Sequence, residues 1–311
     1  MLRNPFKNPV FLSFLLLALV AVFVAFDSPA SAHNALIYTD KVTAAVGEEV
    51  EVGTSTSEPF GNPDMPFYAN EKIEYVYGPV AIVAFEDDKA TELDASICGS
   101  NDGTRKTLSY DEIEAAFLEL KKANPDAPAW SLMTKVFNSN IAKHKIGTSG
   151  TTTLVGHSTY GKGTVVKNLM KTFVNLSPDG ESTKLRGPHF GFDGIELRPV
   201  EDLANVRAGG TVKVEVLLNG KPQSGVIVYC GAKDLPESER IASVSTYTQS
   251  KDPIYSAAIS DRFGIVTLDL PNFPSGANEL RDVYLFSDGH MTIAPEKVRY
   301  RSSINFSINA K

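Results

Sequence analysis

Short runs of alternating polar and apolar residues, separated by turn residues, constrain the fold of the second half of this chain. Thr211–Leu218 alternate as a half-buried β-strand does, and Asn219-Gly220 directly after them favours a tight turn. Val226–Cys230 is then expected to return beside that strand. About seven short strands of this kind are typical of an antiparallel immunoglobulin-like sandwich, which we predict over residues 193–311. The further runs with strand character are 254–259, 265–270, 282–286 and 303–308.

The first half of the chain mixes strand and helix patterns. Ser109 and Glu112 have the spacing of a capping box, so a helix is predicted to begin there and to end before Pro125. A second helix is predicted over residues 130–141. Strands are expected at 35–38, 49–53, 73–77, 80–85, 151–156 and 171–176.

These patterns predict a mainly β protein of two β-sandwich domains. The N-terminal domain is expected over residues 33–180, with a helical insertion at about 109–142. The C-terminal domain is the immunoglobulin-like sandwich over residues 193–311. The segment Ser177–Gly191 between them is rich in glycine, proline, serine and charge, as interdomain linkers are.

The amino terminus has the pattern of a secretory signal over residues 1–32. Arg3 and Lys7 precede the apolar run Val10–Phe26, and Ala30-x-Ala32 then supplies the small residues of a cleavage site. The alternative is an uncleaved anchor, since an apolar run of about 17 residues is only just long enough to span a bilayer. We expect cleavage, which gives a periplasmic, soluble protein that begins at His33 and has no membrane span.

Composition excludes some function classes and leaves the cysteines open. A formal net charge of −7 argues against nucleic-acid binding, which needs a concentrated basic surface. The chain has two cysteines, Cys98 and Cys230. A disulfide between them would join the two halves, whereas a buried free thiol is the alternative for Cys230.

His33 is the residue with the most distinctive chemistry. After cleavage its α-amine and its imidazole belong to one residue and can chelate one metal ion together. The proton of an α-amine has a pKa of about 7.7–8.0, so a metal can displace it near neutral pH. Amine and imidazole nitrogens suit nickel, copper and zinc. The alternative is that histidine simply follows the cleavage site and binds nothing.

The other candidate metal ligands are His157 and His290, because each follows or ends a strand pattern. Asp288 and Met291 lie close to His290 in sequence. His144, at the end of the second predicted helix, is the weakest candidate. No histidine has the H-x-x-x-H spacing of a local metal site, so each is otherwise a solvated or hydrogen-bonded side chain. The chain also lacks a nucleophile–base motif, so we predict that it is not an enzyme.

Three stretches carry a family resemblance: His33–Ile37 with Gly47–Val52, then Gly194–Val200, and then Gly210–Val214 with Asn219–Pro222 and the turn Asp261–Val266. Together they resemble the exported bacterial proteins of domain of unknown function 4198, DUF4198. Some members are described as periplasmic components of nickel-uptake systems, which implies His33 as a metal ligand. Where members often have Gly-His-x-Phe-Pro, this chain has Thr56–Gly61 without a histidine.

The sequence therefore predicts a periplasmic protein that binds a divalent transition metal, Ni(II) or Cu(II), through His33, His157 and His290. Its partner would be an inner-membrane metal transporter. The alternative is an envelope interaction or adhesion module of β-sandwich domains that binds no metal. A third hypothesis, a copper enzyme, needs a second histidine close to His33.

Overall fold

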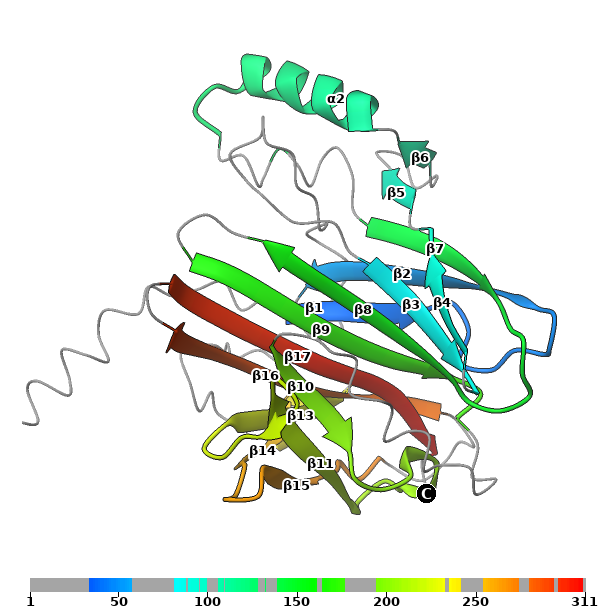
Figure 1. The fold of residues 1–311 in the computed structure, drawn as a ribbon, viewed down its shortest axis with the longest axis vertical. Coiled ribbons are helices and arrows are strands. Elements are labelled where there is room, and N and C mark those ends of the chain that lie inside the picture. Colours follow the sequence, from blue (N-terminus) through cyan, green and yellow to red (C-terminus); the bar gives the residue numbers. More distant parts are fainter. Residues whose placement is uncertain are drawn as a thin grey trace, which may run out of the picture.

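The structure is a computed structural model that describes residues 34–57, 81–87, 89–94, 96–99, 106–108, 110–127, 132, 139–160, 164–176, 194–232, 235–241, 254–273, 280–293 and 296–309. The described part is mainly β, as the sequence predicts (Figure 1). None of its helices combines the length and the apolar character needed to cross a membrane. The signal segment, His33 and the segment 177–191 lie outside the described residues, as does the strand expected at 73–77.

A five-stranded antiparallel sheet is built from the first half of the chain. Its order is β1 (Asn34–Thr39), β2 (Glu49–Ser57), β7 (Ser139–Lys145), β5 (Ser96–Gly99) and β6 (Lys106–Leu108). The helix α2 (Tyr110–Ala123) connects β6 to β7 and ends before Pro125, as predicted (Figure 1).

An eight-stranded sheet runs through the molecule and takes strands from both halves of the chain. Its order is β14 (Ile254–Ile259), β13 (Ile227–Ala232), β16 (Leu280–Ile293), β17 (Glu296–Asn309), β9 (Thr164–Val174), β8 (Thr152–Tyr160), β3 (Ala81–Glu86) and β4 (Lys89–Leu93). β9 and β17 pair in parallel, from Thr164 beside Lys297 to Lys171 beside Ile304. The two predicted domains therefore share one sheet, and their independence stays a prediction.

A smaller sheet contains β10 (Ile195–Pro199), β11 (Thr211–Leu218), β12 (Lys221–Pro222) and β15 (Ile265–Asp269), with β11 in the middle. Asn219 and Gly220 both have positive φ angles, 49° and 75°, as the predicted tight turn requires. The expectation that Val226–Cys230 returns beside β11 is wrong. The returning strand is the short β12, because Pro222 has no N–H to continue the ladder. β13 instead pairs with β14 and β16.

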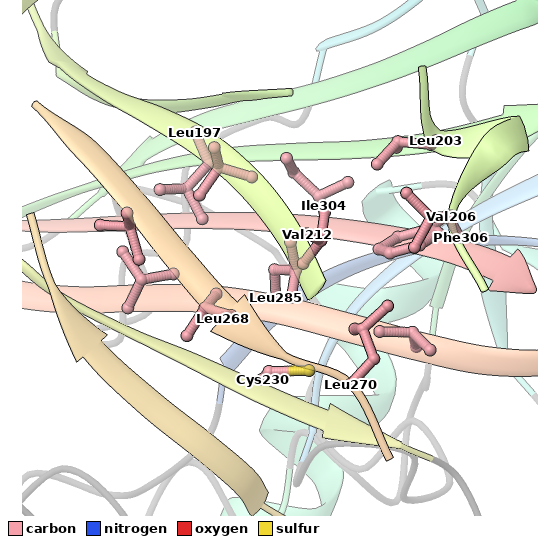
Figure 2. Packing of buried hydrophobic residues seen from close by; sticks show 14 of the residues in the cluster. Leu197, Leu203, Val206, Val212, Cys230, Leu268, Leu270, Leu285, Ile304 and Phe306 are labelled. Atoms are coloured by element: carbon pink, nitrogen blue, oxygen red, sulfur yellow. The ribbon is translucent and has the colours of Figure 1, made fainter. Parts of the chain in front are cut away.

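Two hydrophobic cores lie on opposite faces of the eight-stranded sheet. The carboxyl-terminal core fills the space between this sheet and the smaller one, and its packing is shown in Figure 2. Cys230 lies in this core as a buried free thiol, which is the second of the two alternatives for that residue. The amino-terminal core lies between the eight-stranded and the five-stranded sheets. Its members include Ile37, Val52, Ile82, Leu154, Met170 and Val174.

The prediction of a second helix over residues 130–141 is wrong at its carboxyl end, because residues 139–141 begin the strand β7. Ala142, His144 and Ile146 are buried while Lys143 and Lys145 are exposed, so this segment has the two-residue period of a strand. The partner sheet supplies the reason, since the even-numbered side chains of β7 face the eight-stranded sheet.

Candidate functional site

The interior between the five-stranded and eight-stranded sheets changes from apolar to polar along β9. Met170 and Val174 lie in the amino-terminal core, but the next inward position on the same strand is Asn168, which is fully buried. Ser158 lies beside it on β8 and is also buried. We call the region of Thr54, Ser158, Asn168, Arg299 and Arg301 the polar end of the sandwich.

The strand β1 follows β9 towards the polar end. Beyond β1, the amide of Asn175 donates to the carbonyl of Val42 at 2.9 Å. Within the two strands, the side chains of Ile37 and Met170 both lie next to the position that a Cβ on Gly156 would occupy. These two contacts have the same offset between the two segments. Figure 1 shows β1 alongside β9 and β17.

The sheet register defines two rows at the polar end. In the first row Ser158 pairs with Asn168, Asn168 with Arg301, and Arg301 with Asp288. The second row lies two residues further towards the same end of the sheet. In the second row Tyr160 pairs with Val166, Val166 with Arg299, and Arg299 with His290.

Strand alternation assigns these rows to the face that β1 covers. On β17 the even-numbered residues, such as Val298 and Tyr300, belong to the carboxyl-terminal core, so Arg299 and Arg301 lie on the opposite face. On β16, Tyr284 and Phe286 pack with Leu36 of β1.

Two buried oxygen atoms at the polar end have no hydrogen-bond partner among the described residues. The side-chain amide of Asn168 donates from Nδ2 to the Ser158 hydroxyl at 2.9 Å, and its Oδ1 is left unpaired. The hydroxyl of Thr54 on β2 is the second such group. A buried polar atom without a partner is rare in folded proteins, and it indicates a position where a ligand or water belongs.

Arginine gives the polar end a positive charge. Arg299 and Arg301 are both buried, with 6% of each residue exposed. The backbone of Asp288 is in register with Arg301.

The structure does not bring His157 together with His290. On β8 the inward positions are 154, 156 and 158, so His157 lies on the face turned away from β1. β9 and β17 also separate the strands of these two histidines, which gives about 14 Å across the sheet. His157 is half-buried, and burial lowers its pKa while the nearby Glu92 opposes that shift.

His144, ranked weakest from the sequence, is a buried residue of β7 rather than the end of a helix. Its Nε2 lies 3.0 Å from Oε1 of Glu86 on β3. The same carboxylate accepts hydrogen bonds from the amide of Gly147 and the hydroxyl of Thr152, each at 2.9 Å. This contact joins the five-stranded sheet to the eight-stranded one.

No group of three or more histidine, cysteine or acidic side chains with the geometry of a metal site occurs within the part of the chain that the structure describes. His33 and His189 are outside that part.

Comparison with solved structures finds matches at low identity and low TM-score. A DUF4785 family protein from Legionella pneumophila is 9% identical, with 81% of this chain and 50% of that chain covered and a TM-score of 0.25. The Yersinia pseudotuberculosis adhesin InvE is 10% identical, with 91% and 60% covered and a TM-score of 0.23. A putative membrane anchored protein from Corynebacterium diphtheriae is 14% identical, with 89% and 59% covered and a TM-score of 0.22. The chain spans about half to three fifths of these proteins, and scores this low support no functional conclusion.

Comparison with curated protein sequences finds no match. The family comparison does, over most of the chain. The model of the domain of unknown function DUF4198 matches residues 30–273, and this chain therefore belongs to the DUF4198 family.

Proposed function

We propose that this chain is an exported protein which binds a divalent transition metal through His33 at the polar end of the sandwich. The start of β1 at Asn34 supports this proposal, because β1 contacts β9 and β17, the strands that contain the buried Asn168, Arg299 and Arg301. The metal is cargo, and an inner-membrane transporter is the proposed recipient.

The proposed donor set combines His33 with His290. Cleavage after Ala32 gives His33 an α-amine beside its own imidazole, and two nitrogens from one residue form a chelate ring. His290 adds a third nitrogen, and this set suits Ni(II) and Cu(II). His157 is not part of the proposed site.

Calorimetric titration of Ni(II), Cu(II), Zn(II) and Co(II) tests the proposal. The protein that begins at His33 is compared with one that begins at Ala32, in which the free amine has moved off the histidine. We expect tight binding to the first protein alone, and a loss of about tenfold or more in His290→Gln. His157→Gln is the matched control and should bind normally. Absence of binding, or equal binding by both proteins, would sink the proposal.

A second candidate function is an envelope interaction module without a metal. It is favoured by the turn after β14, where Ile259 and Phe263 are 63% and 59% exposed. The guanidinium of Arg262 lies 4.6 Å from the centre of the Phe263 ring, which adds a cation–π contact at this tip. If this function is the main one, Ile259→Ser with Phe263→Ser abolishes binding to envelope preparations, and a chelator leaves that binding unchanged.

A further inference from the structure

The turn between β14 and β15 presents two large apolar side chains to solvent. Ile259 ends β14 and is 63% exposed, and Phe263 lies two residues before β15 and is 59% exposed. The two residues are four positions apart in one turn. β14 and β15 lie near the end of the molecule opposite the helix α2, as Figure 1 shows. We call residues 259–264 the β14–β15 tip.

Hydrogen bonds hold the β14–β15 tip in one conformation. Oδ1 of Asp261 accepts from the amides of Phe263 and Ile265, at 2.8 and 2.9 Å. The buried Ser260 ties the turn to the neighbouring loop, because its hydroxyl donates to the carbonyl of Gln223 at 2.8 Å. A turn that is already ordered loses little conformational entropy on binding, so its exposed side chains contribute more to affinity.

Basic side chains accompany the two apolar ones. The guanidinium of Arg262 lies 4.6 Å from the centre of the neighbouring phenyl ring. Lys221 is exposed on β12, and the next residue, Pro222, has its Cα only 3.2 Å from where a Cβ on Gly264 would lie. The acid of the tip, Asp261, directs one carboxylate oxygen at the amides of its own turn. Basic groups therefore outnumber acidic ones here, in a chain whose formal net charge is −7.

We propose that the β14–β15 tip docks on an anionic lipid surface, with Ile259 and Phe263 inserted among the acyl chains and Arg262 beside a headgroup phosphate. A few apolar side chains with basic neighbours are enough for reversible binding at a membrane interface. A stable protein interface buries about 800 Å² on each partner, far more than two side chains on a turn offer. The inference deepens the second candidate function by naming lipid as the partner, and it rests on the export that both candidate functions require.

Cosedimentation with vesicles tests this proposal, using the chain from His33 to Lys311 in EDTA so that no metal contributes. The vesicles contain phosphatidylglycerol and phosphatidylcholine in equal parts, or phosphatidylcholine alone. We expect binding to the anionic vesicles, weakened about tenfold or more by Ile259→Ser with Phe263→Ser. Arg262→Gln should weaken the binding about fivefold and should make it less sensitive to salt.

Val46→Ser with Leu118→Ser is the matched control for the loss of exposed apolar surface. These side chains are 59% and 53% exposed but lie outside the tip, so this variant should bind as the parent does. Tryptophan fluorescence covers the case in which the serine variant of the tip fails to fold. After subtraction of the parent's emission, Phe263→Trp should shift to shorter wavelength on anionic vesicles, whereas Leu118→Trp should not.

Equal binding by the parent and the serine variant of the tip would overturn the proposal, and so would an unchanged emission of Phe263→Trp. Binding to envelope preparations without binding to protein-free vesicles would also overturn it, because the tip would then contact a protein or a glycan. Failure of metal binding has a separate signature, since it appears in the calorimetric titration and leaves vesicle binding in EDTA unchanged.

Discussion

A buried ion pair between two sheets gives the sharpest test of how this fold is stabilised. Lys171 of β9 donates from Nζ to a carboxylate oxygen of Glu196 on β10, and also to the carbonyl of Leu197 at 3.0 Å. The two charged side chains are only 4% and 2% exposed. Burial lowers the pKa of Lys171, and the charge of Glu196 opposes that shift.

Lys171→Met leaves the Glu196 carboxylate buried without its cation. Breaking a buried pair from one side costs about 3–5 kcal/mol of unfolding free energy, which corresponds to a fall in Tm of roughly 6–15 °C for a chain of this size. Replacing both residues by Met removes both charges together. The double variant should recover most of the loss, because well-packed apolar side chains of similar volume often replace a buried pair without penalty.

Chemical denaturation of Lys171→Met, of Glu196→Met and of the double variant measures these free energies. The control is the pair of Arg198 with Glu215, whose side chains are 28% and 18% exposed, and Arg198→Gln should cost less than about 1 kcal/mol. A Lys171→Met variant as stable as the parent would refute the reasoning. So would a double variant no better than the single one.

Three smaller predictions concern single residues. Burial raises the pKa of the Glu86 carboxyl, but the hydrogen bonds from Gly147, His144 and Thr152 outweigh it and lower the pKa overall. A carboxyl with a lowered pKa stabilises the fold at a pH above the ordinary carboxyl range, and this stabilisation is lost on acidification. The difference in Tm between the parent and Glu86→Gln should therefore shrink from neutral pH towards about pH 3. Burial raises the pKa of Cys230 to about 12, so a thiol reagent should label it only after unfolding. Gly264 has a φ of 78° and a Cβ there would meet the carbonyl oxygen of Val216 at 2.8 Å, so Gly264→Ala should destabilise by about 1–3 kcal/mol in denaturation experiments.

Local signals predicted individual strands well and their partners poorly. The strands at 211–218 and 254–259 have the bounds expected from alternation, because the two-residue period is a property of each strand alone. The parallel pairing of β9 with β17 joins residues more than 100 positions apart. No turn fixes such a register, so it depends on packing that a local pattern does not contain.

The candidate site illustrates the same limit at the level of single residues. Histidines were selected by residue type, but strand parity decides whether a side chain faces the interior. His157 lies one position from Ser158 and is therefore on the other face of β8. Asn168 and Arg301 belong to no motif and were not selected from the sequence. The alternation of Val298 and Tyr300 with arginine was a usable signal, since it implies two buried faces on one strand.

The shared sheet makes a strong prediction about the N-terminal half as an isolated fragment. Residues 33–180 contain β9, but without β17 that strand becomes an edge. Its Leu169 and Phe173, on the face of the carboxyl-terminal core, also lose their cover. Such an edge exposes unpaired backbone groups along its length and invites aggregation. Arg299 and Arg301 are also lost, so the polar end cannot form. We therefore expect the fragment to lack cooperative unfolding by circular dichroism and to bind 8-anilinonaphthalene-1-sulfonate, while the chain from His33 to Lys311 unfolds cooperatively. A fragment that is monomeric and unfolds cooperatively would instead show that residues 33–180 are an independent domain, and that the eight-stranded sheet is two sheets joined along β9 and β17.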